Sequence, residues 1–201
     1  MNNNKDNVNN PKYQQIMTAG TKLLIRHGIK RVTIEEICEE SGVSKMTFYK
    51  FFKNKIELVK KILTDMMDEG FKVSDNIMAQ DIPFQEKAKQ NIKYKIEIIR
   101  KYGDLFFEEV FKMPELQPFL FEMKKNNIKN ILKIFNRGIE EGALRENITP
   151  EFYQYLLEYI NIMGNDDNLK TIFPDMGQRV EELINVLFYG VFKEKPDHTE
   201  A

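Results

Sequence analysis

The sequence predicts an all-α fold of about nine helices, and three observations lead to this prediction. Apolar residues recur every three or four positions along most of the 201 residues, which is the spacing that places side chains on one side of an α-helix. Capping residues, prolines and glycines divide these stripes into segments of helical length. The alternation of apolar and polar residues that marks a half-buried strand is almost absent.

The first helix is expected from about Lys12 to Gly28. Pro11 precedes it, and proline suits the first turn of a helix. His27 falls in the last turn, where a positive charge complements the carbonyl end of the helix. The apolar side of this helix carries Ile16, Ala19, Gly20, Leu23 and Leu24.

The next segment predicts two short helices joined by a tight glycine turn. Thr33 and Glu36 fit a capping box, so a helix begins at Thr33 and ends near Glu40. Gly42 stands where a chain leaving a helix often needs a positive φ, which costs glycine little. Ser44 then offers a second N-cap. This spacing is that of a helix-turn-helix, a DNA-reading device.

The second of these helices presents a basic and polar surface. Two turns suffice to carry Phe48 and Phe52 to the core, which leaves its other residues outside. A lysine-rich run alone indicates only a solvated face, but here it coincides with two caps and a turn glycine. We expect Lys45, Met46 and Thr47 to contact base edges. Contacts to phosphate are expected from Thr33, Ser44, Tyr49, Lys50, Lys53 and Lys55.

The remaining helices follow from caps and breaks. We expect helices over residues 54–76, from 83 to a break at 102–103, over the apolar run 105–111, after a proline restart at 114–118, over 128–139, over 150–163 and over 175–192. Gly142 is a predicted C′ glycine, and Thr149 caps a helix that has Pro150 at its first position.

Charge is distributed unevenly along the chain. Residues 1–55 hold ten Lys/Arg and five Asp/Glu, a net charge of +5, whereas residues 56–201 hold 20 and 26, a net charge of −6. The formal net charge of −1 therefore hides a basic N-terminal region, where a polyanionic partner is expected.

The segment from Ile16 to Leu58 resembles the DNA-binding domain of the TetR family of transcriptional regulators. Cys38 and Ser41 stand where alanines are usual, and Met46 stands where a small or variable residue is common. We expect Cys38 to be a small buried core residue. The residues that match the family pattern are Ile16, Ala19, Leu23, Gly28, Thr33, Ile34, Ile37, Gly42, Val43, Ser44, Thr47, Phe48, Tyr49, Phe52, Lys55 and Leu58.

The C-terminal part is also similar to that family, through GIEEGALREN at residues 138–147 and the apolar final helix ending LFYGVF. The resemblance implies an all-α regulator that dimerises through its last two helices and binds a small molecule in its helical body. We therefore expect a disordered tail at 1–11, a three-helix DNA-binding domain at 12–55, a larger helical ligand-binding and dimerisation domain at 56–193 and a C-terminal tail at 194–201.

The last two long helices each carry a broad apolar face, and one intramolecular core seldom needs both. Two copies of the chain would pack four such helices into a bundle about a two-fold axis. The alternative is that these stripes only seal the core of the monomer. The residues expected at the dimer interface are Tyr155, Leu156, Tyr159, Ile160, Met163, Val180, Leu183, Ile184, Leu187 and Val191.

The body is rich in aromatic residues and methionine, which suit an adaptable pocket for an apolar or aromatic ligand. Each of these residues is alternatively a core residue. The candidates for ligand binding are Phe71, Phe106, Phe107, Phe111, Phe121, Tyr153, Tyr159 and Met163.

Together with these observations, the family resemblance implies a repressor that binds palindromic DNA as a homodimer and is released by a small-molecule ligand. The alternative is a helical protein-interaction module with a vestigial head. No catalytic motif, metal-ligand cluster or cofactor loop is present, so we expect no enzyme, metal or cofactor. One cysteine and a polar start, together with uncharged runs of at most ten residues, favour a cytoplasmic protein without a membrane span.

Overall fold

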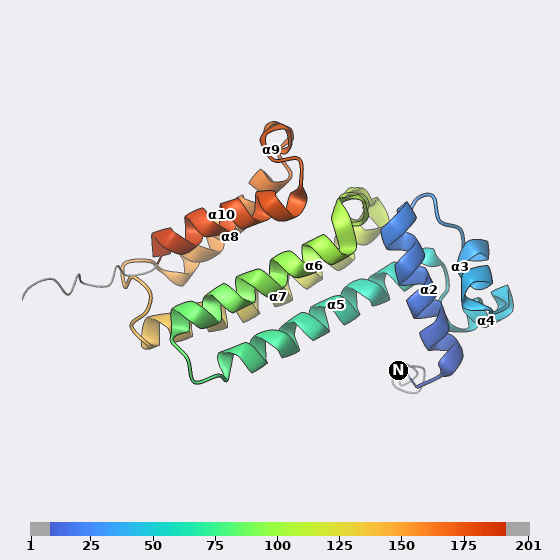
Figure 1. Ribbon diagram of the computed structural model, residues 1–201, viewed down its shortest axis with the longest axis horizontal. Helices are drawn as coiled ribbons and strands as arrows, with labels where there is room; N and C mark the ends of the chain where they lie inside the picture. The colour runs from blue at the N-terminus through green and yellow to red at the C-terminus, as the bar shows by residue number, and fades with distance from the viewer. Residues whose placement is uncertain (1–8, 192–201) are drawn as a thin grey trace, which may run out of the picture. The chain divides into compact units, whose positions relative to one another are not determined.

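The computed structural model describes residues 9–191, and within them the chain forms nine α-helices, one short 3-10 helix and no strand (Figure 1). The predicted all-α fold class is confirmed. The elements are α2 (Pro11–His27), α3 (Ile34–Ser41), α4 (Lys45–Phe51), α5 (Lys55–Met78), α6 (Phe84–Lys112), η1 (Pro114–Leu116), α7 (Gln117–Glu140), α8 (Pro150–Gly164), α9 (Asp167–Ile172) and α10 (Met176–Val191).

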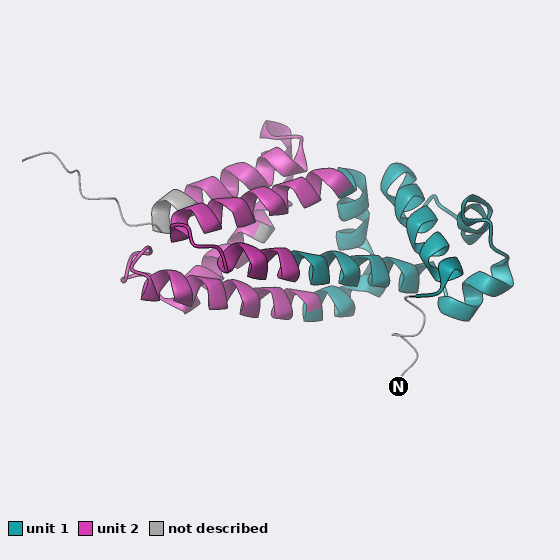
Figure 2. Ribbon diagram, turned by 60° about the horizontal axis from the view of Figure 1, so that its bottom comes forward, with its two compact units in different colours: residues 1–70, 102–122 teal, residues 71–101, 123–201 magenta. Residues whose placement is uncertain are grey.

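The chain divides into two compact units, which Figure 2 colours separately. Unit 1 comprises residues 1–70 and 102–122, and unit 2 comprises residues 71–101 and 123–201. Helices α2, α3 and α4 lie in unit 1, whereas α8, α9 and α10 lie in unit 2. The longer helices α5, α6 and α7 each begin in one unit and end in the other.

In unit 1, α2 packs against α3 and α4, and α3 also contacts α4. The spacing of apolar residues in the sequence accounts for this packing, because each short helix buries one stripe. Tyr13 of α2 stacks on Phe52 with ring centroids 5.4 Å apart. The single cysteine, Cys38, is buried, and this burial raises the pKa of its thiol. The fully buried residues of this core include Ile16, Leu24, Ile29, Ile37, Phe48 and Leu58.

Helix α6 is interrupted at Gly103, as the sequence predicted. Its φ of 75° and ψ of 160° are not helical, and a positive φ is accessible to glycine because it has no Cβ. The helix resumes at once and carries Phe106 and Phe107 into unit 1, where their ring centroids are 5.7 Å apart. The boundary between the two units also falls here, between residues 101 and 102.

Unit 2 has its own apolar cluster, formed by Met78, Phe84, Phe135, Leu144 and Ile148. Gly138 of α7 makes this packing possible, since a Cβ there would lie 2.6 Å from two atoms of the Phe84 ring. Elsewhere in the unit α8 packs against α10. The predicted cap at Thr149 is present, with its hydroxyl accepting from the backbone N–H of Phe152 at 3.2 Å.

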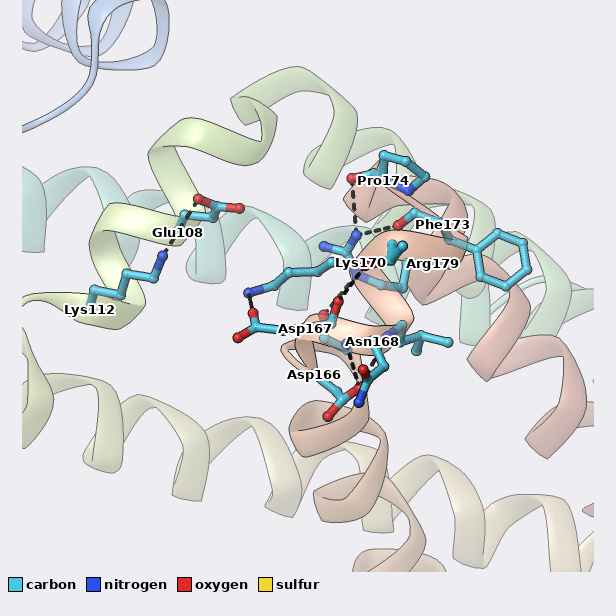
Figure 3. A network of polar contacts seen from close by, with 12 residues as sticks. Glu108, Lys112, Asp166, Asp167, Asn168, Lys170, Phe173, Pro174 and Arg179 are labelled. Atoms are coloured by element: carbon cyan, nitrogen blue, oxygen red, sulfur yellow. Dashed lines mark hydrogen bonds and ion pairs between the residues drawn. The ribbon is translucent and has the colours of Figure 1, made fainter.

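The short helix α9 was not predicted, and a buried arginine holds the connection that contains it (Figure 3). Arg179 is 1% exposed. Its Nε donates to the carbonyl of Gly164 at 2.8 Å, and its Nη1 donates to the carbonyls of Phe173 and Pro174. The guanidinium thereby satisfies carbonyls at the ends of α8 and α9, positions where a helix itself supplies no partner.

Within residues 9–191, none of the helices combines the length and the apolar character that crossing a membrane requires.

Candidate nucleic-acid interface

Helices α3 and α4 form the helix-turn-helix that the sequence predicted. The capping box is complete, because the Thr33 hydroxyl accepts from the Glu36 N–H at 3.2 Å while Glu36 Oε2 accepts from the Thr33 N–H at 2.7 Å. The bond from the Thr33 N–H lowers the pKa of the Glu36 carboxyl. Gly42 adopts the left-handed conformation, with φ 65° and ψ 28°, and its N–H donates to the carbonyls of Cys38 and Glu39.

Helix α4 begins at the predicted second cap. The Ser44 hydroxyl accepts from the backbone N–H of Thr47 at 3.2 Å, and the hydroxyls of Ser44 and Thr47 lie 3.0 Å apart. Phe48 is fully buried and is the residue that fixes α4 against the core. Its ring contacts that of Tyr49 in an edge-to-face arrangement, with centroids 5.7 Å apart. The helix is therefore anchored on one side and free on the other.

The free side of α4 carries the residues assigned to DNA. Met46 is 82% exposed and Tyr49 is 53% exposed, so both offer apolar surface to a partner. Lys45 and Lys50 are exposed beside them, whereas Thr47 is half-buried. Lys53, in the connection to α5, is exposed as well. The lysines and the threonine hydroxyl can bond to phosphates and base edges, and the apolar methionine can contact a thymine methyl group.

Lys45 already has an acidic partner in the free protein. Its ammonium forms an ion pair with Glu35 of α3, and both side chains are exposed. The hydrogen bond between them lowers the pKa of the Glu35 carboxyl and raises that of Lys45. An ammonium has three N–H groups, so Lys45 can contact DNA while it is still paired, but Glu35 keeps a negative charge beside it.

Three of the predicted phosphate contacts have partners within the protein: Ser44, whose hydroxyl caps α4, together with Lys55 and Thr33. Lys55 is half-buried, and its ammonium donates to the carbonyls of Lys30 and Val32. Burial lowers the pKa of Lys55, and the neighbouring Glu109 opposes that shift. Two N–H groups of the Lys55 ammonium are used in these bonds, which leaves the third for a phosphate. The exposed Thr33 uses its hydroxyl in the capping box. Contact with DNA remains a prediction for all three residues.

The eight residues suggested for ligand binding are divided equally between the two units. Phe106 and Phe107 are buried in unit 1, whereas Phe111 and Phe121, in the same unit, are exposed. The Phe107 and Phe111 rings stack with centroids 6.1 Å apart.

The other four candidates, Phe71, Tyr153, Tyr159 and Met163, lie in unit 2. Tyr153 stacks on Phe135 at 4.4 Å, and burial raises its pKa to about 12. A solvent-open hollow of about 680 Å³ along α7 contains none of the eight, and is lined by Lys129, Leu132, Lys133, Asn136, Arg137, Glu140 and Glu141. The role of the eight candidate residues in ligand binding remains a prediction.

The residues suggested for dimerisation lie on α8 and α10, in unit 2. On α8, Tyr155 is 59% exposed, Tyr159 is 50% exposed and Met163 is 38% exposed. The half-buried members are Leu156, Ile160, Val180, Leu183, Ile184 and Leu187. Leu187 packs on the apolar cluster of unit 2, and the side chain of Val191 lies outside the described residues.

Three contacts of charged side chains in unit 1 were missed by sequence reasoning. The pair between Glu35 and Lys45 could have been predicted, because the glutamate lies in the first turn of α3 and the lysine lies in the first turn of the next helix, α4. The carbonyl partners of Lys55 had none, since they lie 23 and 25 residues away. Glu109 likewise contacts backbone N–H groups about 80 positions earlier in the chain.

An anchored helix-turn-helix with an exposed polar face defines a DNA-binding transcriptional regulator, and comparisons with known proteins agree. Residues 16–62 match the model of the bacterial regulatory proteins of the tetR family. The uncharacterized HTH-type transcriptional regulator YhgD of Bacillus subtilis is 29% identical over 147 residues, covering 71% of this chain and 76% of that protein. The fatty acid metabolism regulator protein of the same organism is 26% identical over 149 residues, covering 69% of this chain and 73% of that protein.

The crystal structure of the regulator FadR from Bacillus subtilis in complex with stearoyl-CoA has the same fold. It superposes with a TM-score of 0.67 at 18% identity, covering 89% of this chain and 98% of that structure. The segment 16–62 of this chain is therefore similar to the DNA-binding domain of the TetR family of transcriptional regulators, and the fold of the rest is that of the solved regulators. The relatives named here are regulators rather than enzymes.

Proposed function

We propose that the protein is a transcriptional repressor that binds a palindromic operator as a homodimer and leaves it when a small-molecule ligand binds. The observation that carries this proposal is the outward face of α4, where Lys45, Met46, Tyr49 and Lys50 are exposed above the buried Phe48. A solvent-facing methionine and tyrosine gain nothing in water, but they gain contact area in a groove of DNA.

The roles follow from the chemistry of each group. Lys45 at a guanine edge, Met46 on a thymine methyl group and Thr47 at a base edge would read sequence. Contacts to phosphate would set the register without reading sequence. That second group comprises Thr33, Ser44, Tyr49, Lys50, Lys53 and Lys55.

Dimerisation is supported by the uncovered apolar stripe on α8. Phe152, Tyr155, Tyr159 and Ile162 are spaced by three or four residues and therefore lie along one side of the helix. Their exposed fractions lie between 50% and 65%. Val186 of the neighbouring α10 is 76% exposed. Exposed apolar patches of this kind mark interaction sites, and the same patch on a second copy would be self-complementary about a two-fold axis.

The ligand is proposed to be apolar or aromatic, and a long acyl chain is the first candidate because the related FadR was solved with stearoyl-CoA. Helix α5 begins in unit 1 and ends in unit 2 without a break, so it can carry a rearrangement of the body to the DNA-binding head. A ligand that binds better to a second arrangement would shift the population toward it and relieve repression.

We further propose that the protein acts in the cytoplasm, that it is not an enzyme, and that residues 12–55 and 56–193 divide the work between DNA binding and ligand binding with dimerisation.

The test is a selection of bound sequences from a random pool of double-stranded DNA with the full chain. We expect an inverted repeat, because each protomer reads one half-site. A Thr47→Ala variant should relax the choice at one base position in each half-site, whereas Lys50→Ala should weaken binding to all selected sequences alike. Absence of enrichment, or enrichment of a site without two-fold symmetry, would count against the proposal.

The ligand is tested with stearoyl-CoA as the probe and coenzyme A as the control. Stearoyl-CoA should raise the thermal melting temperature and release the selected operator, because a ligand that binds the folded state stabilises it. Coenzyme A alone should do neither. If both probes leave the operator complex unchanged, the acyl-chain assignment is wrong, and the DNA-binding part of the proposal is unaffected.

A further inference from the structure

The turn between α2 and α3 is built into the core of unit 1 and is held by two charged side chains that come from α5 and α6, outside the three helices α2, α3 and α4 of the DNA-binding head. Ile29 and Val32, its apolar residues, are fully or almost fully buried. Gly28 opens the turn with φ 84°, a conformation in which successive N–H groups can converge on one anion.

That anion is the carboxylate of Glu109, from the last part of α6. Its Oε2 accepts from the backbone N–H of Ile29, and also from that of Lys30 at 3.0 Å. The carboxylate lies directly over Gly28, where a Cβ would be 3.0 Å from Oε2 and 3.2 Å from the carboxyl carbon. Any residue other than glycine would be strained by its φ and would crowd the carboxylate as well.

The opposite charge holds the carbonyl side of the same turn. The Lys55 ammonium, at the start of α5, donates to the carbonyls of Lys30 and Val32. Both N–H and C=O groups of the turn are therefore bonded to ionised side chains, and such hydrogen bonds are stronger than neutral ones. Glu109 and Lys55 also attract each other across the turn.

Because Glu109 lies in the last part of α6, its bonds to the turn tie the DNA-binding head to that helix. Residues 104–112 follow the non-helical Gly103 and belong to unit 1, while the first part of α6 belongs to unit 2. The segment 104–112 therefore connects the head to the rest of α6. Within this segment, Glu109 bonds to the backbone of the head through the N–H groups of Ile29 and Lys30.

We propose that Glu109 is a positioning residue for DNA recognition, which fixes the head on the last part of α6 and so restricts the half-site separation that the dimer accepts. This inference rests on the proposed function. Adding or removing one base pair moves a half-site by about 3.4 Å and turns it by about 35°. A head held at two points cannot follow such a displacement, whereas a head held only through α5 can.

The test compares the wild-type chain with Glu109→Gln, which keeps the shape of the side chain and removes its charge. Binding is measured on the selected inverted repeat and on repeats with one or two base pairs added or removed at the centre. The wild type should favour one separation strongly. In the variant, discrimination between separations should fall about tenfold, with a smaller loss of affinity for the best site.

The matched control is Glu108→Gln, because Glu108 is the neighbouring carboxylate and pairs only with Lys112 of its own helix at 3.8 Å among the contacts described. It should keep the wild-type preference. Glu109→Asp, which withdraws the carboxylate by one methylene, should give an intermediate preference and serves if the glutamine variant folds poorly. Amide hydrogen exchange at Ile29 and Lys30 should be about tenfold faster in Glu109→Gln.

The outcomes separate the two proposals. A wild type that ignores DNA overturns the proposed function and this inference together. A wild type with a preferred separation that Glu109→Gln retains overturns this inference alone. Unchanged exchange at Ile29 and Lys30 likewise overturns it, because the contact would then not exist in solution.

Discussion

Replacing Tyr155 by glutamate should dissociate the proposed dimer. The side chain of Tyr155 is 59% exposed on the apolar stripe of α8. A tyrosine presents about 200 Å² of surface, so about 120 Å² remains uncovered in the monomer. At about 25 cal/mol per Å² this surface corresponds to about 3 kcal/mol per copy, and a two-fold axis doubles it.

Only part of that free energy reaches the dissociation constant, because association also costs entropy and desolvation. Taking half of the doubled value leaves about 3 kcal/mol, which is about a hundredfold increase in the dimer dissociation constant. The buried charge of the new glutamate, facing its copy across the axis, adds to this loss.

Sedimentation equilibrium over a range of concentrations measures the effect directly. The wild type should be a dimer at micromolar concentration, and Tyr155→Glu should be a monomer with an unchanged helical circular dichroism spectrum. The matched control is Met46→Glu, since Met46 is 82% exposed but lies on α4. It should remain a dimer and lose DNA binding. A Tyr155→Glu variant that dimerises as tightly as the wild type would refute the reasoning.

Three further predictions concern single contacts. Glu35→Gln should tighten operator binding about two- to fivefold at low salt, because it releases Lys45 and removes a negative charge near the DNA; equal or weaker binding in a fluorescence titration would contradict this. Gly138→Ala should lower the free energy of unfolding by about 1–3 kcal/mol in urea, because its Cβ would lie 2.6 Å from a buried phenylalanine ring. Gly20→Ala should cost less, since its Cβ meets one terminal methyl group at 2.7 Å and alanine favours a helix; the reverse order would be inconsistent with the packing. The pKa of Glu36 is lowered in the folded protein, so its contribution to stability is complete above its ordinary value of 4.5 and is lost as the pH falls through the folded value. The difference in melting temperature between the wild type and Glu36→Gln should therefore shrink from pH 7 to pH 3, and a constant difference would be evidence against the capping role.

The helix-turn-helix could be predicted closely because its signals are local. Thr33, Gly42 and Ser44 each act on backbone groups within four residues, so the sequence alone contains both partners of each contact. The break at Gly103 and the left-handed Gly142, with φ 66°, are of the same kind. Helix α9 has such a signal in its Asp166 cap, but six residues are too few to show a helical stripe.

Contacts between distant segments could not be predicted. Nothing near Glu109 in the sequence indicates that its carboxylate bonds to the turn at Ile29, about 80 residues earlier. The same holds for Arg179, whose partners are backbone carbonyls. Every residue has one, so the sequence does not indicate which of them the arginine contacts. Aromatic residues at helical spacing also look alike whether they are buried or not, since Phe106 is fully buried and Phe121 is 62% exposed.

The central claim is that two copies of α4 and its flanking lysines enter grooves of one DNA duplex, and the salt dependence of binding to the selected inverted repeat tests it most directly. With Lys50, Lys53 and Lys55 on phosphates in each of two heads, log Kd plotted against log salt concentration should have a slope of about 5. Lys53→Ala should lower that slope by about two, one for each head. A slope near zero, or one that Lys53→Ala leaves unchanged, would contradict the account.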